Sequence, residues 1–305
     1  MLKQETRAWT VKDLMKVCID LLTKKGIDEA RLNVELLLAH ALQVPRLYLY
    51  TNFDKPLNKS ELRTFRELLE RRLNREPVQY ILGSSTFMGL KFGVDQRVLI
   101  PRPETETLVE QALLAVKEVS EKKRVTILDI GTGSGNIAVS VAKFDKECDV
   151  VAIDSSAAAL EVAVGNAERN EVLDRIVFKE MDVFEPIDQL LLRRFDLVLS
   201  NPPYVPEAEY ETLAMEIRRF EPQAALVAGK DGLDYCRRII ELAPFLVSDK
   251  GQLLIEIGFG QHSMVIELME NAGFSEVVVT PDLQGVPRVI SARVPSRTRN
   301  QGHVN

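Results

Sequence analysis

"VTILDIGTGSGNIAVSVA", residues 125–142, is the stretch that decides the fold. An apolar segment typical of a buried strand runs into a glycine turn, and small and apolar residues at helical spacing follow. Glycine adopts backbone conformations with positive φ and lets a ligand approach the main chain, so Gly131, Gly133 and Gly135 predict a ligand loop. The N–H groups that open the next helix would face the same ligand. Many nucleotide-binding folds share such a loop, so it does not identify the ligand by itself.

From about residue 104 the chain alternates between strand and helix patterns. Strands are predicted at 125–130, 149–154, 175–180, 195–200, 251–257, 275–280 and 287–293. Helices are predicted at 104–119, 135–144, 156–169, 232–247 and 261–272. This alternation predicts an α/β fold with a seven-stranded, mostly parallel sheet that binds ligands at the carboxyl ends of its strands. The last two strands have no helix between them and should pair as an antiparallel hairpin.

The residues before this sheet predict a small helical bundle and a linker. "TVKD" at 10–13 resembles a capping box, Gly26 suits a helix end, and three amphipathic helices follow up to about residue 75, the second with apolar residues on one face. Between Pro77 and Pro103, "VQYILG", "TFMGLKFGVD" and "RVLIPRP" have strand character and glycine-containing gaps, which predicts a β-hairpin. The predicted domains are a helical domain at 1–76, a β-hairpin linker at 77–103, the α/β domain at 104–294 and a disordered tail at 295–305.

Composition and charge describe an ordinary soluble protein. The 305 residues are 46% hydrophobic and 28% charged, with a net charge of −6, and no segment resembles a membrane span or a secretion signal. A chain that only binds nucleic acid would usually be basic. Residues 1–75 are basic, with 15 Lys and Arg against 10 Asp and Glu, which suits an acidic partner or, more commonly, a solvated helix surface.

Cysteine and histidine are few and scattered. Cys18, Cys148 and Cys236 form no C-x-x-C pair, which argues against a disulfide framework and fits a reducing compartment. The three histidines lack the spacing of metal ligands. We therefore expect a cytoplasmic protein without a metal site.

Three aspartates follow successive predicted strands, whose carboxyl ends should meet at one edge of the sheet. Asp129 can accept from a cationic amino group, Asp154 from both hydroxyls of a ribose, and Asp182 from an adenine amino group. The G-x-G-x-G spacing also differs from the dinucleotide pattern G-x-G-x-x-G. An ammonium, a ribose and an adenine without phosphates describe S-adenosylmethionine, so the sheet is predicted to be a Rossmann-like methyltransferase fold. Each aspartate alone could instead cap a turn.

"FDLVLSNPPYV", residues 195–205, ends the fourth strand at the same edge. Proline lacks an N–H group and fixes φ, so the chain must leave the sheet in a rigid turn. A planar amide or amino nitrogen attacks a methyl group poorly, and the Asn201 side-chain oxygen and the Pro202 carbonyl could accept from its N–H groups. Pro202 and Pro203 would keep both oxygens aimed, and Tyr204 could lay its ring against the flat group. Taken alone, the turn could equally be structural.

Five longer segments carry a more specific pattern: "PVQYILGSSTFMGLKF" at 77–92, "VLIPRPETETLVE" at 98–110, "LDIGTGSGNIAVSVA" at 128–142, "SNPPYV" at 200–205 and "EPQAALVAGKDGLDYCRRII" at 221–240. Together they resemble the protein-(glutamine-N5) methyltransferases that modify peptide chain release factors, the PrmC/HemK family. The resemblance covers nearly the whole chain. Amino-methylating DNA enzymes share N-P-P-Y, whereas "IPRPETE" is far more specific.

The resemblance implies roles for particular residues. With the aspartates above, the predicted cofactor-binding residues are Asp129, Gly131, Thr132, Gly133, Ser134, Gly135, Asp154, Asp182, Val183, Phe184, Asn201, Arg102, Pro103 and Thr105. Asn201 and Pro202 are the predicted catalytic residues, and the glutamine would be held by Asn201, Pro202, Pro203 and Tyr204. The segment from Arg102 to Thr105 would close over the site, although Pro103 also suits the first turn of a helix.

The implied substrate is the glutamine of the Gly-Gly-Gln motif in class I release factors, with S-adenosylhomocysteine as the product of the cofactor. Two glycines before the target would let its amide reach a recessed site. The helical domain at 1–76 is the candidate for substrate recognition at a distance. We expect a monomer with no membrane partner and no direct nucleic-acid binding.

Two other functions remain open. Methylation of an adenine amino group (N6) in nucleic acid would explain N-P-P-Y equally well, but the α/β part is acidic and shows no segment for base flipping. A non-catalytic binding protein could retain the same fold, although the intact set of Asp129, Asp154 and Asn201 argues against it.

Overall fold

The computed structural model describes residues 9–119, 124–192 and 195–295, which divide into two compact units. Unit 1 comprises the chain up to Gly83 together with Ala214–Phe220. Unit 2 comprises Ser84–Leu213 and the chain from Glu221 onward. The predicted tail at 295–305 lies outside the described residues from position 296.

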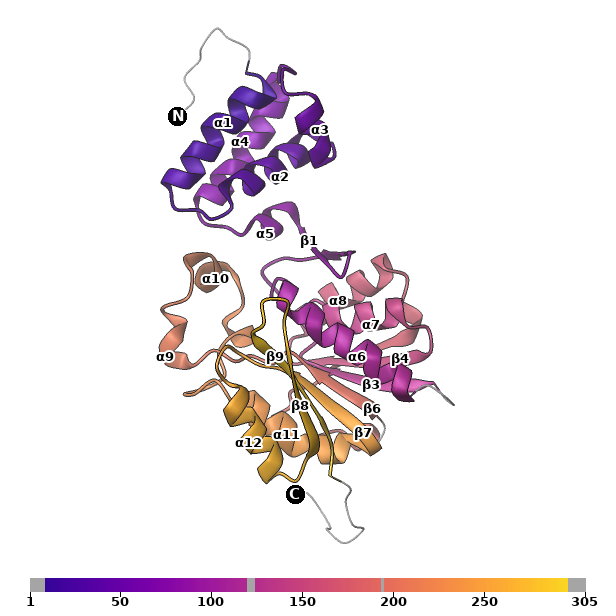
Figure 1. Ribbon diagram of the computed structural model, residues 1–305. Coiled ribbons are helices and arrows are strands. Elements are labelled where there is room, and N and C mark those ends of the chain that lie inside the picture. Colours follow the sequence, from indigo (N-terminus) through magenta and orange to yellow (C-terminus); the bar gives the residue numbers. More distant parts are fainter. Residues whose placement is uncertain (1–8, 120–123, 193–194, 296–305) are drawn as a thin grey trace. The chain divides into compact units, whose positions relative to one another are not determined.

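Unit 1 contains the helices α1 (Val11–Lys24), α2 (Ala30–Leu42), α3 (Arg46–Thr51), α4 (Lys59–Leu73), α5 (Val78–Leu82) and α10 (Met215–Phe220). Figure 1 shows α1 to α4 packed as a bundle. The three predicted helices are α1, α2 and α4. Thr10 Oγ1 accepts from the amide of Asp13 at 3.2 Å, and Gly26 has a φ of 62° just beyond α1, so both predicted ends of this helix are confirmed. The sequence does not predict α3, because its 6 residues are too few for a helical period to show.

Helix α2 is buried on more than the one predicted face. Asn33 and Glu35 are buried beside its apolar residues. Arg72 Nε donates to Asn33 Oδ1 at 2.7 Å, and Arg31 Nε donates to Glu35 Oε1 at 2.9 Å. These partners satisfy both buried polar side chains, so α2 packs as a central helix of the bundle.

The predicted β-hairpin is formed by β1 (Ser84–Phe87) and β2 (Leu90–Gly93). It belongs to unit 2, whereas the sequence predicted it as part of a separate linker at 77–103. The amide of Gly93 donates to Asn166 Oδ1 at 2.6 Å, and Asn166 Nδ2 donates back to the Gly93 carbonyl at 2.9 Å. The strand character predicted for "VQYILG" is wrong, because Pro77 begins and Gly83, with a φ of 66°, ends helix α5. The stretch 97–103 is not a strand either, since its prolines cannot join a ladder.

Unit 2 contains the predicted seven-stranded sheet. Its strands are β3 (Val125–Ile130), β4 (Cys148–Asp154), β5 (Ile176–Glu180), β6 (Phe195–Ser200), β7 (Val247–Glu256), β8 (Ser275–Pro281) and β9 (Pro287–Arg293). They run in the order β5-β4-β3-β6-β7-β9-β8, and β9 pairs antiparallel with both neighbours, which confirms the predicted terminal hairpin. The chain moves outward from β3 to β5 and then returns to β6. The strand order therefore reverses between β3 and β6, where α/β sheets bind ligands.

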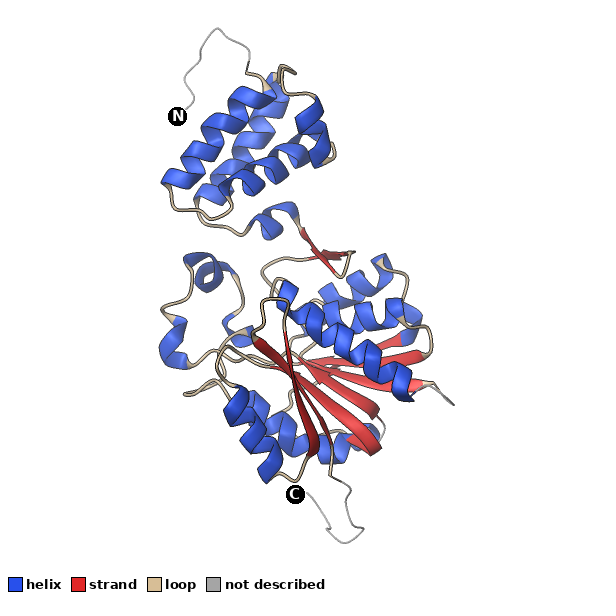
Figure 2. Ribbon diagram, viewed as in Figure 1, coloured by secondary structure: helices blue, strands red, loops and turns tan. Residues whose placement is uncertain are grey.

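Helices cover both faces of this sheet (Figures 1 and 2). One face carries α6 (Glu106–Val119), α7 (Asn136–Phe144) and α8 (Ala157–Arg169), and the other carries α11 (Asp234–Leu246) and α12 (His262–Asn271). Shorter helical turns are α9 (Glu207–Tyr210), η1 (Pro103–Thr105), η2 (Leu173–Arg175), η3 (Gln189–Leu191) and η4 (Gln223–Ala225). Because both faces are covered, the central strands β3 and β6 are buried along nearly their whole length, whereas the edge strand β5 is mostly half-buried or exposed.

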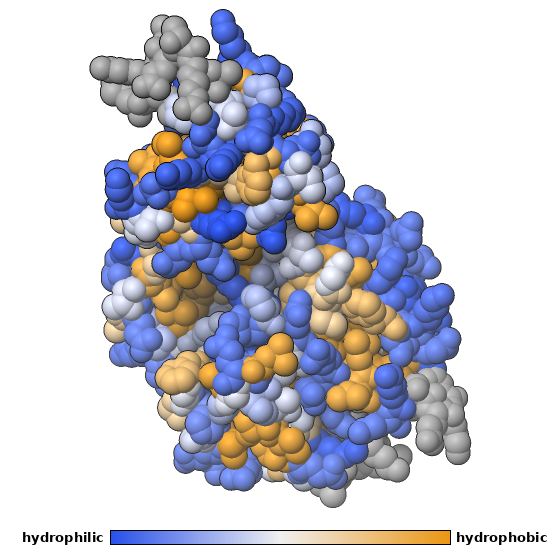
Figure 3. Space-filling model, turned by 45° about the horizontal axis from the view of Figure 1, so that its top comes forward, coloured by the Kyte–Doolittle hydropathy of each residue, from blue (hydrophilic) through white to orange (hydrophobic). Residues whose placement is uncertain are grey.

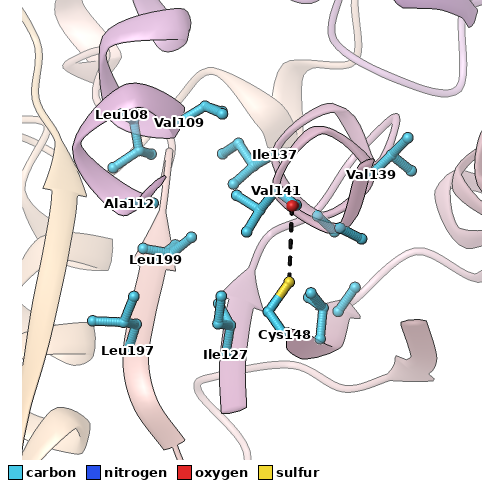
Figure 4. Packing of buried hydrophobic residues seen from close by; sticks show 14 of the residues in the cluster. Leu108, Val109, Ala112, Ile127, Ile137, Val139, Val141, Cys148, Leu197 and Leu199 are labelled. Carbon is cyan, nitrogen blue, oxygen red and sulfur yellow. Dashed lines mark hydrogen bonds between the residues drawn. The ribbon is translucent and has the colours of Figure 1, made fainter. Parts of the chain in front are cut away.

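The hydrophobic core fixes the two strands that flank the ligand edge. Figure 4 shows Leu108 of α6 and Ile137 of α7 packed over Ile127 of β3 and Leu197 of β6, all at most 2% exposed. Cys148 lies in the same cluster, with its Sγ 3.8 Å from the Val141 carbonyl oxygen. Close packing of this kind holds the strand ends, and hence the loops that follow them, in fixed positions.

Hydrophilic side chains cover most of the face shown in Figure 3, and hydrophobic ones form separate patches. The three cysteines are all buried and unpaired. Across the described ranges, no helix is both long and apolar enough to cross a membrane. The same ranges contain no group of three or more His, Cys, Asp and Glu side chains arranged to hold a metal ion.

Candidate active site

A cavity of about 200 Å³ opens in unit 2 at the carboxyl ends of β3, β4 and β6. The predicted site residues that line it are Gly131, Gly133, Asp154, Asp182, Val183, Asn201, Pro202 and Pro203. The predicted residues that do not line it are Asp129, Thr132, Ser134, Gly135, Phe184, Tyr204, Arg102, Pro103 and Thr105. Residues from separate strand ends thus meet at the point where the strand order reverses.

The glycine turn between β3 and α7 forms one wall. Gly131, Gly133 and Gly135 have φ values of 72°, 55° and 78°, which other residues rarely adopt. A Cβ at Gly131 would meet nothing within 4 Å, and one at Gly133 would meet only a backbone oxygen at 4.0 Å. A Cβ at Gly135 would come within 3.1 Å of the Cβ of Ala163. The first two glycines therefore leave room for a ligand, whereas the third allows α7 and α8 to pack closely.

Asp129 lies fully buried behind this turn. Its Oδ2 accepts from Thr132 Oγ1 at 2.6 Å and from the amide of Ala138 at 3.3 Å. Its Oδ1 has no hydrogen-bond partner within the described part of the chain. Burial raises the pKa of this carboxyl to about 7. Asp129 does not line the cavity, so in this structure its unpaired Oδ1 is closed off from a ligand by the turn.

Asp154 ends β4 and connects the glycine turn to α8. Its Oδ2 accepts from the amide of Gly133 and its Oδ1 from the amide of Ser156, both at 2.9 Å. Burial raises the pKa of Asp154. Each carboxylate oxygen keeps a second lone pair, so Asp154 can still accept from two adjacent hydroxyls. Ser155 and Ser156 also line the cavity, although a serine before a helix suggests only a cap in the sequence.

The side predicted to meet the adenine is formed by the turn after β5 and by α11. Asp182 Oδ1 accepts from the amide of Phe184 at 2.9 Å, and Val183 is buried. Phe184 stands edge-on to Tyr235 with ring centroids 5.0 Å apart. Tyr235, not Phe184, lines the cavity. Tyr235 was not among the predicted site residues; its sequence signal is an aromatic residue in the first turn of a predicted helix.

The Asn-Pro-Pro-Tyr turn leaves β6 on another side of the cavity. Asn201 Nδ2 donates to Thr105 Oγ1 at 3.0 Å, so the Asn201 Oδ1 is left to accept from a ligand. Gln261 Nε2 donates to the carbonyl of Tyr204 at 3.0 Å, which holds the far end of the turn. A Cβ at Gly258 would lie 3.0 Å from the Tyr204 ring, so the ring is tightly enclosed. Burial raises the pKa of Tyr204, which therefore stays neutral.

Two segments that the sequence analysis did not assign complete the cavity. The residues that they contribute are Arg97, Val98, Leu99, Pro222, Ala224 and Ala225. The buried Glu221 joins these segments, because its Oε1 accepts from Arg102 Nη2 at 2.5 Å and its Oε2 from the amide of Ile100 at 3.3 Å. In this structure Arg102 therefore supports the cavity wall through an ion pair. The only sequence signal for Glu221 is its place in the quoted segment 221–240.

A second buried carboxyl lies near Asn201. Glu256 is the last residue of β7, is 1% exposed, and accepts a hydrogen bond from the Thr105 side chain. Its Oε2 has no partner within the described ranges. Burial raises the pKa of Glu256 to about 7. Glu256 was not among the predicted site residues; its sequence signal is an acid inside the apolar run "LLIEIG".

Comparisons with known proteins agree with this arrangement. The family model "PrmC N-terminal domain" matches residues 13–83, and the model "Methyltransferase small domain" matches residues 110–232. The chain is 42% identical over 291 residues to the release factor glutamine methyltransferase of Geobacter sulfurreducens, covering 95% of this chain and 99% of that protein. It is also 42% identical over 290 residues to the protein of that name in Chlorobaculum tepidum, covering 94% and 98%.

One solved structure shows the same fold at low identity. It is the hMettl16 catalytic domain in complex with MAT2A 3′UTR hairpin 6, with a TM-score of 0.53 and 18% identity. The match covers 69% of this chain and 77% of that chain.

Proposed function

This chain belongs to the family of release factor glutamine methyltransferases, and we propose that the Asn201–Tyr204 turn is its acceptor site. The enzyme transfers a methyl group from S-adenosylmethionine to the side-chain nitrogen (N5) of a release factor glutamine. The observation that supports this acceptor site is the orientation of the Asn201 amide: Nδ2 donates to Thr105, which leaves Oδ1 to accept from a ligand.

The acceptor chemistry requires oxygens rather than a base. An amide nitrogen becomes tetrahedral and gains positive charge as it attacks a methyl group. Asn201 Oδ1 and the Pro202 carbonyl would accept from its two N–H groups and stabilise that charge. Pro202 and Pro203 hold both oxygens in place before the substrate arrives, so little reorganisation is needed during the reaction. The proton can leave to solvent after the transfer, so no enzyme group has to remove it beforehand.

The cavity residues fit S-adenosylmethionine, which supplies a methyl group on a sulfonium when bound. Gly131 and Gly133 leave open space at the turn, and Asp129 behind the turn is the proposed acceptor for the amino group. Asp154 would accept from the ribose hydroxyls. Asp182 would bind the adenine amino group, and the ring of Tyr235 would flank the base. In this proposal no metal takes part.

Selection of the glutamine would depend on the Gly-Gly-Gln motif of class I release factors, because two glycines let the amide enter a recessed site. We propose that unit 1 contacts the release factor elsewhere, since residues 1–75 are basic and Arg63 and Arg66 are exposed on α4. A substrate that acts in translation places the enzyme in the cytoplasm. One enzyme molecule would act as a monomer on one release factor.

An adenine amino group is the second candidate acceptor, because the same two oxygens could hold its N–H groups. The hMettl16 catalytic domain, which has the same fold, was solved in complex with an RNA hairpin, so we retain adenine as a candidate. The acidic character of residues 76–305, with 24 Lys and Arg against 35 Asp and Glu, disfavours nucleic acid.

A competition assay separates the two acceptors. The enzyme is incubated with methyl-labelled S-adenosylmethionine, a purified class I release factor, and DNA and RNA in the same tube. We expect label in the release factor alone, entering about 10²–10³ times more slowly when Asn201→Ala replaces the wild-type enzyme. Label that enters nucleic acid and leaves the release factor unmodified would overturn the glutamine assignment.

A further inference from the structure

Three elements of unit 2 meet behind the acceptor site. Asn201 follows β6, Glu256 ends β7, and Thr105 ends η1 just before α6. Ser200 and Ile255 are register partners on adjacent parallel strands, so Asn201 and Glu256 leave the sheet at the same level. Asn201 Nδ2 donates to Thr105 Oγ1, and the Thr105 hydroxyl hydrogen-bonds the Glu256 carboxyl. Thr105 and Glu256 are each 1% exposed, so water has little access to the bond between them.

The direction of this hydrogen-bond chain follows from the number of protons. An ionised carboxylate can only accept, and a threonine hydroxyl carries a single proton. When that proton is donated to Glu256, the Thr105 oxygen can only accept from Asn201. Asn201 must then present Nδ2 to Thr105, which turns its Oδ1 toward the acceptor site.

We propose that Thr105 and Glu256 are positioning residues that fix the Asn201 side-chain amide with its oxygen toward the methyl acceptor. This inference rests on the proposed role of Asn201 as an acceptor of hydrogen bonds from the substrate amide. The two ends of an asparagine amide have nearly the same shape, so packing alone does not choose between them. In the reversed orientation, Nδ2 would face the N–H groups of the substrate and could not hold them.

The charge of Glu256 makes this orientation depend on pH. The groups around it are Thr105 and Glu104 of η1, Tyr204 of the turn after β6 and Arg288 of β9. Arg288 lowers the pKa of Glu256 and Glu104 raises it, but Arg288 is also paired with Asp282, its Nε 3.3 Å from Oδ2.

Burial dominates these effects and raises the pKa of Glu256 to about 7. A protonated Glu256 could donate to Thr105, whose hydroxyl could then donate to Asn201 Oδ1 and reverse the chain. At low pH, the Asn201 amide would therefore no longer be fixed with its oxygen toward the acceptor site.

The first test measures turnover of full-length variants on a purified class I release factor at saturating S-adenosylmethionine. Thr105→Val removes the hydroxyl and keeps the shape, and Thr105→Ser is the matched control that keeps the hydroxyl. We expect Thr105→Val to lower kcat roughly tenfold, the scale of one neutral hydrogen bond, with KM and cofactor affinity nearly unchanged. Thr105→Ser should retain most of the activity.

The pH profile supplies a signature that a purely structural role would not produce. In the wild type and in Thr105→Ser, kcat should fall as the pH drops through about 7. In Glu256→Gln and in Thr105→Val this step should be absent. Equal kcat for Thr105→Val and Thr105→Ser at every pH, or an acid step that persists in Glu256→Gln, would overturn the positioning role.

The second test needs no substrate. The side-chain ¹⁵N signal of Asn201, assigned by its loss in Asn201→Asp, is followed against pH in the free enzyme and in Glu256→Gln. We expect the signal to titrate with one ionisation in the wild type and to stay constant in the variant. A titrating signal without any methylation of release factor would refute the proposed function and support the hydrogen-bond chain. A signal that ignores pH would refute the chain even in an active enzyme.

Discussion

Replacing Asn201 by alanine separates acceptor binding from cofactor binding. The change removes Oδ1, one of the two oxygens proposed to hold the substrate nitrogen, and leaves the Pro202 carbonyl. Loss of one preorganised hydrogen-bonding group typically lowers kcat by about 10²–10³, so we expect a decrease of this size. The change also breaks the 3.0 Å bond to Thr105, which costs about 1 kcal/mol of stability. The variant should therefore stay folded at 25 °C.

The assay combines single-turnover methylation of a purified release factor with calorimetric titration of S-adenosylmethionine. Asn201→Ala should lower the methylation rate and leave the cofactor Kd nearly unchanged. Asp154→Asn is the matched control, because it alters a carboxylate that binds the turn at Gly133 and should raise the cofactor Kd. A parallel loss of cofactor affinity and methylation rate in Asn201→Ala would contradict the assigned role, and so would an unchanged rate.

Three further changes test the supporting structure. Gly135→Ala should destabilise the protein by about 1–3 kcal/mol in urea unfolding, because the new Cβ would lie 3.1 Å from a side chain of α8 and the φ of this residue is 78°. Gly165→Ala, on the exposed surface of helix α8, is the control and should stabilise the protein by about 0.5–1 kcal/mol. The folded-state pKa of Glu256 is raised from 4.5 to about 7, so the wild-type protein loses stability as the pH rises through that range. The free energy of unfolding of Glu256→Gln, measured relative to that of the wild type, should therefore increase by up to about 3 kcal/mol between pH 5 and pH 8. Arg102→Ala leaves the buried Glu221 without its charged partner, so it should lower the free energy of unfolding by about 1–3 kcal/mol and weaken cofactor binding. Arg102→Lys should recover part of both losses. An unchanged unfolding midpoint in Arg102→Ala would argue against the ion pair.

The sheet could be predicted because its signals are local. Strands buried on both faces are continuous apolar runs, and the helices between them show a clear period, so the alternation after residue 104 fixed the element order. Helix α5 was predicted as a strand because "VQYILG" is apolar and short, and only its enclosing Pro77 and Gly83 reveal the helix. The burial of Asn33 and Glu35 in α2 depends on arginine partners that the helix pattern does not show.

The candidate site could be predicted where it follows strand ends. Asp154 and Asn201 line one cavity because parallel strands bring their carboxyl ends together. The walls at 97–99 and 222–225 could not be predicted, since their meeting depends on the long-range contacts of Glu221. The role of Glu256 could not be predicted either, because its partner Thr105 lies about half the chain away in sequence.

Methylation of the Gly-Gly-Gln glutamine is tested most directly by tandem mass spectrometry of a purified class I release factor after incubation with this enzyme and S-adenosylmethionine. We expect one added methyl group on the side-chain nitrogen of the Gly-Gly-Gln glutamine, and an initial rate about 10²–10³ lower with Asn201→Ala. A methyl group on any other residue, or an unmodified motif after complete incubation with active enzyme, would contradict it.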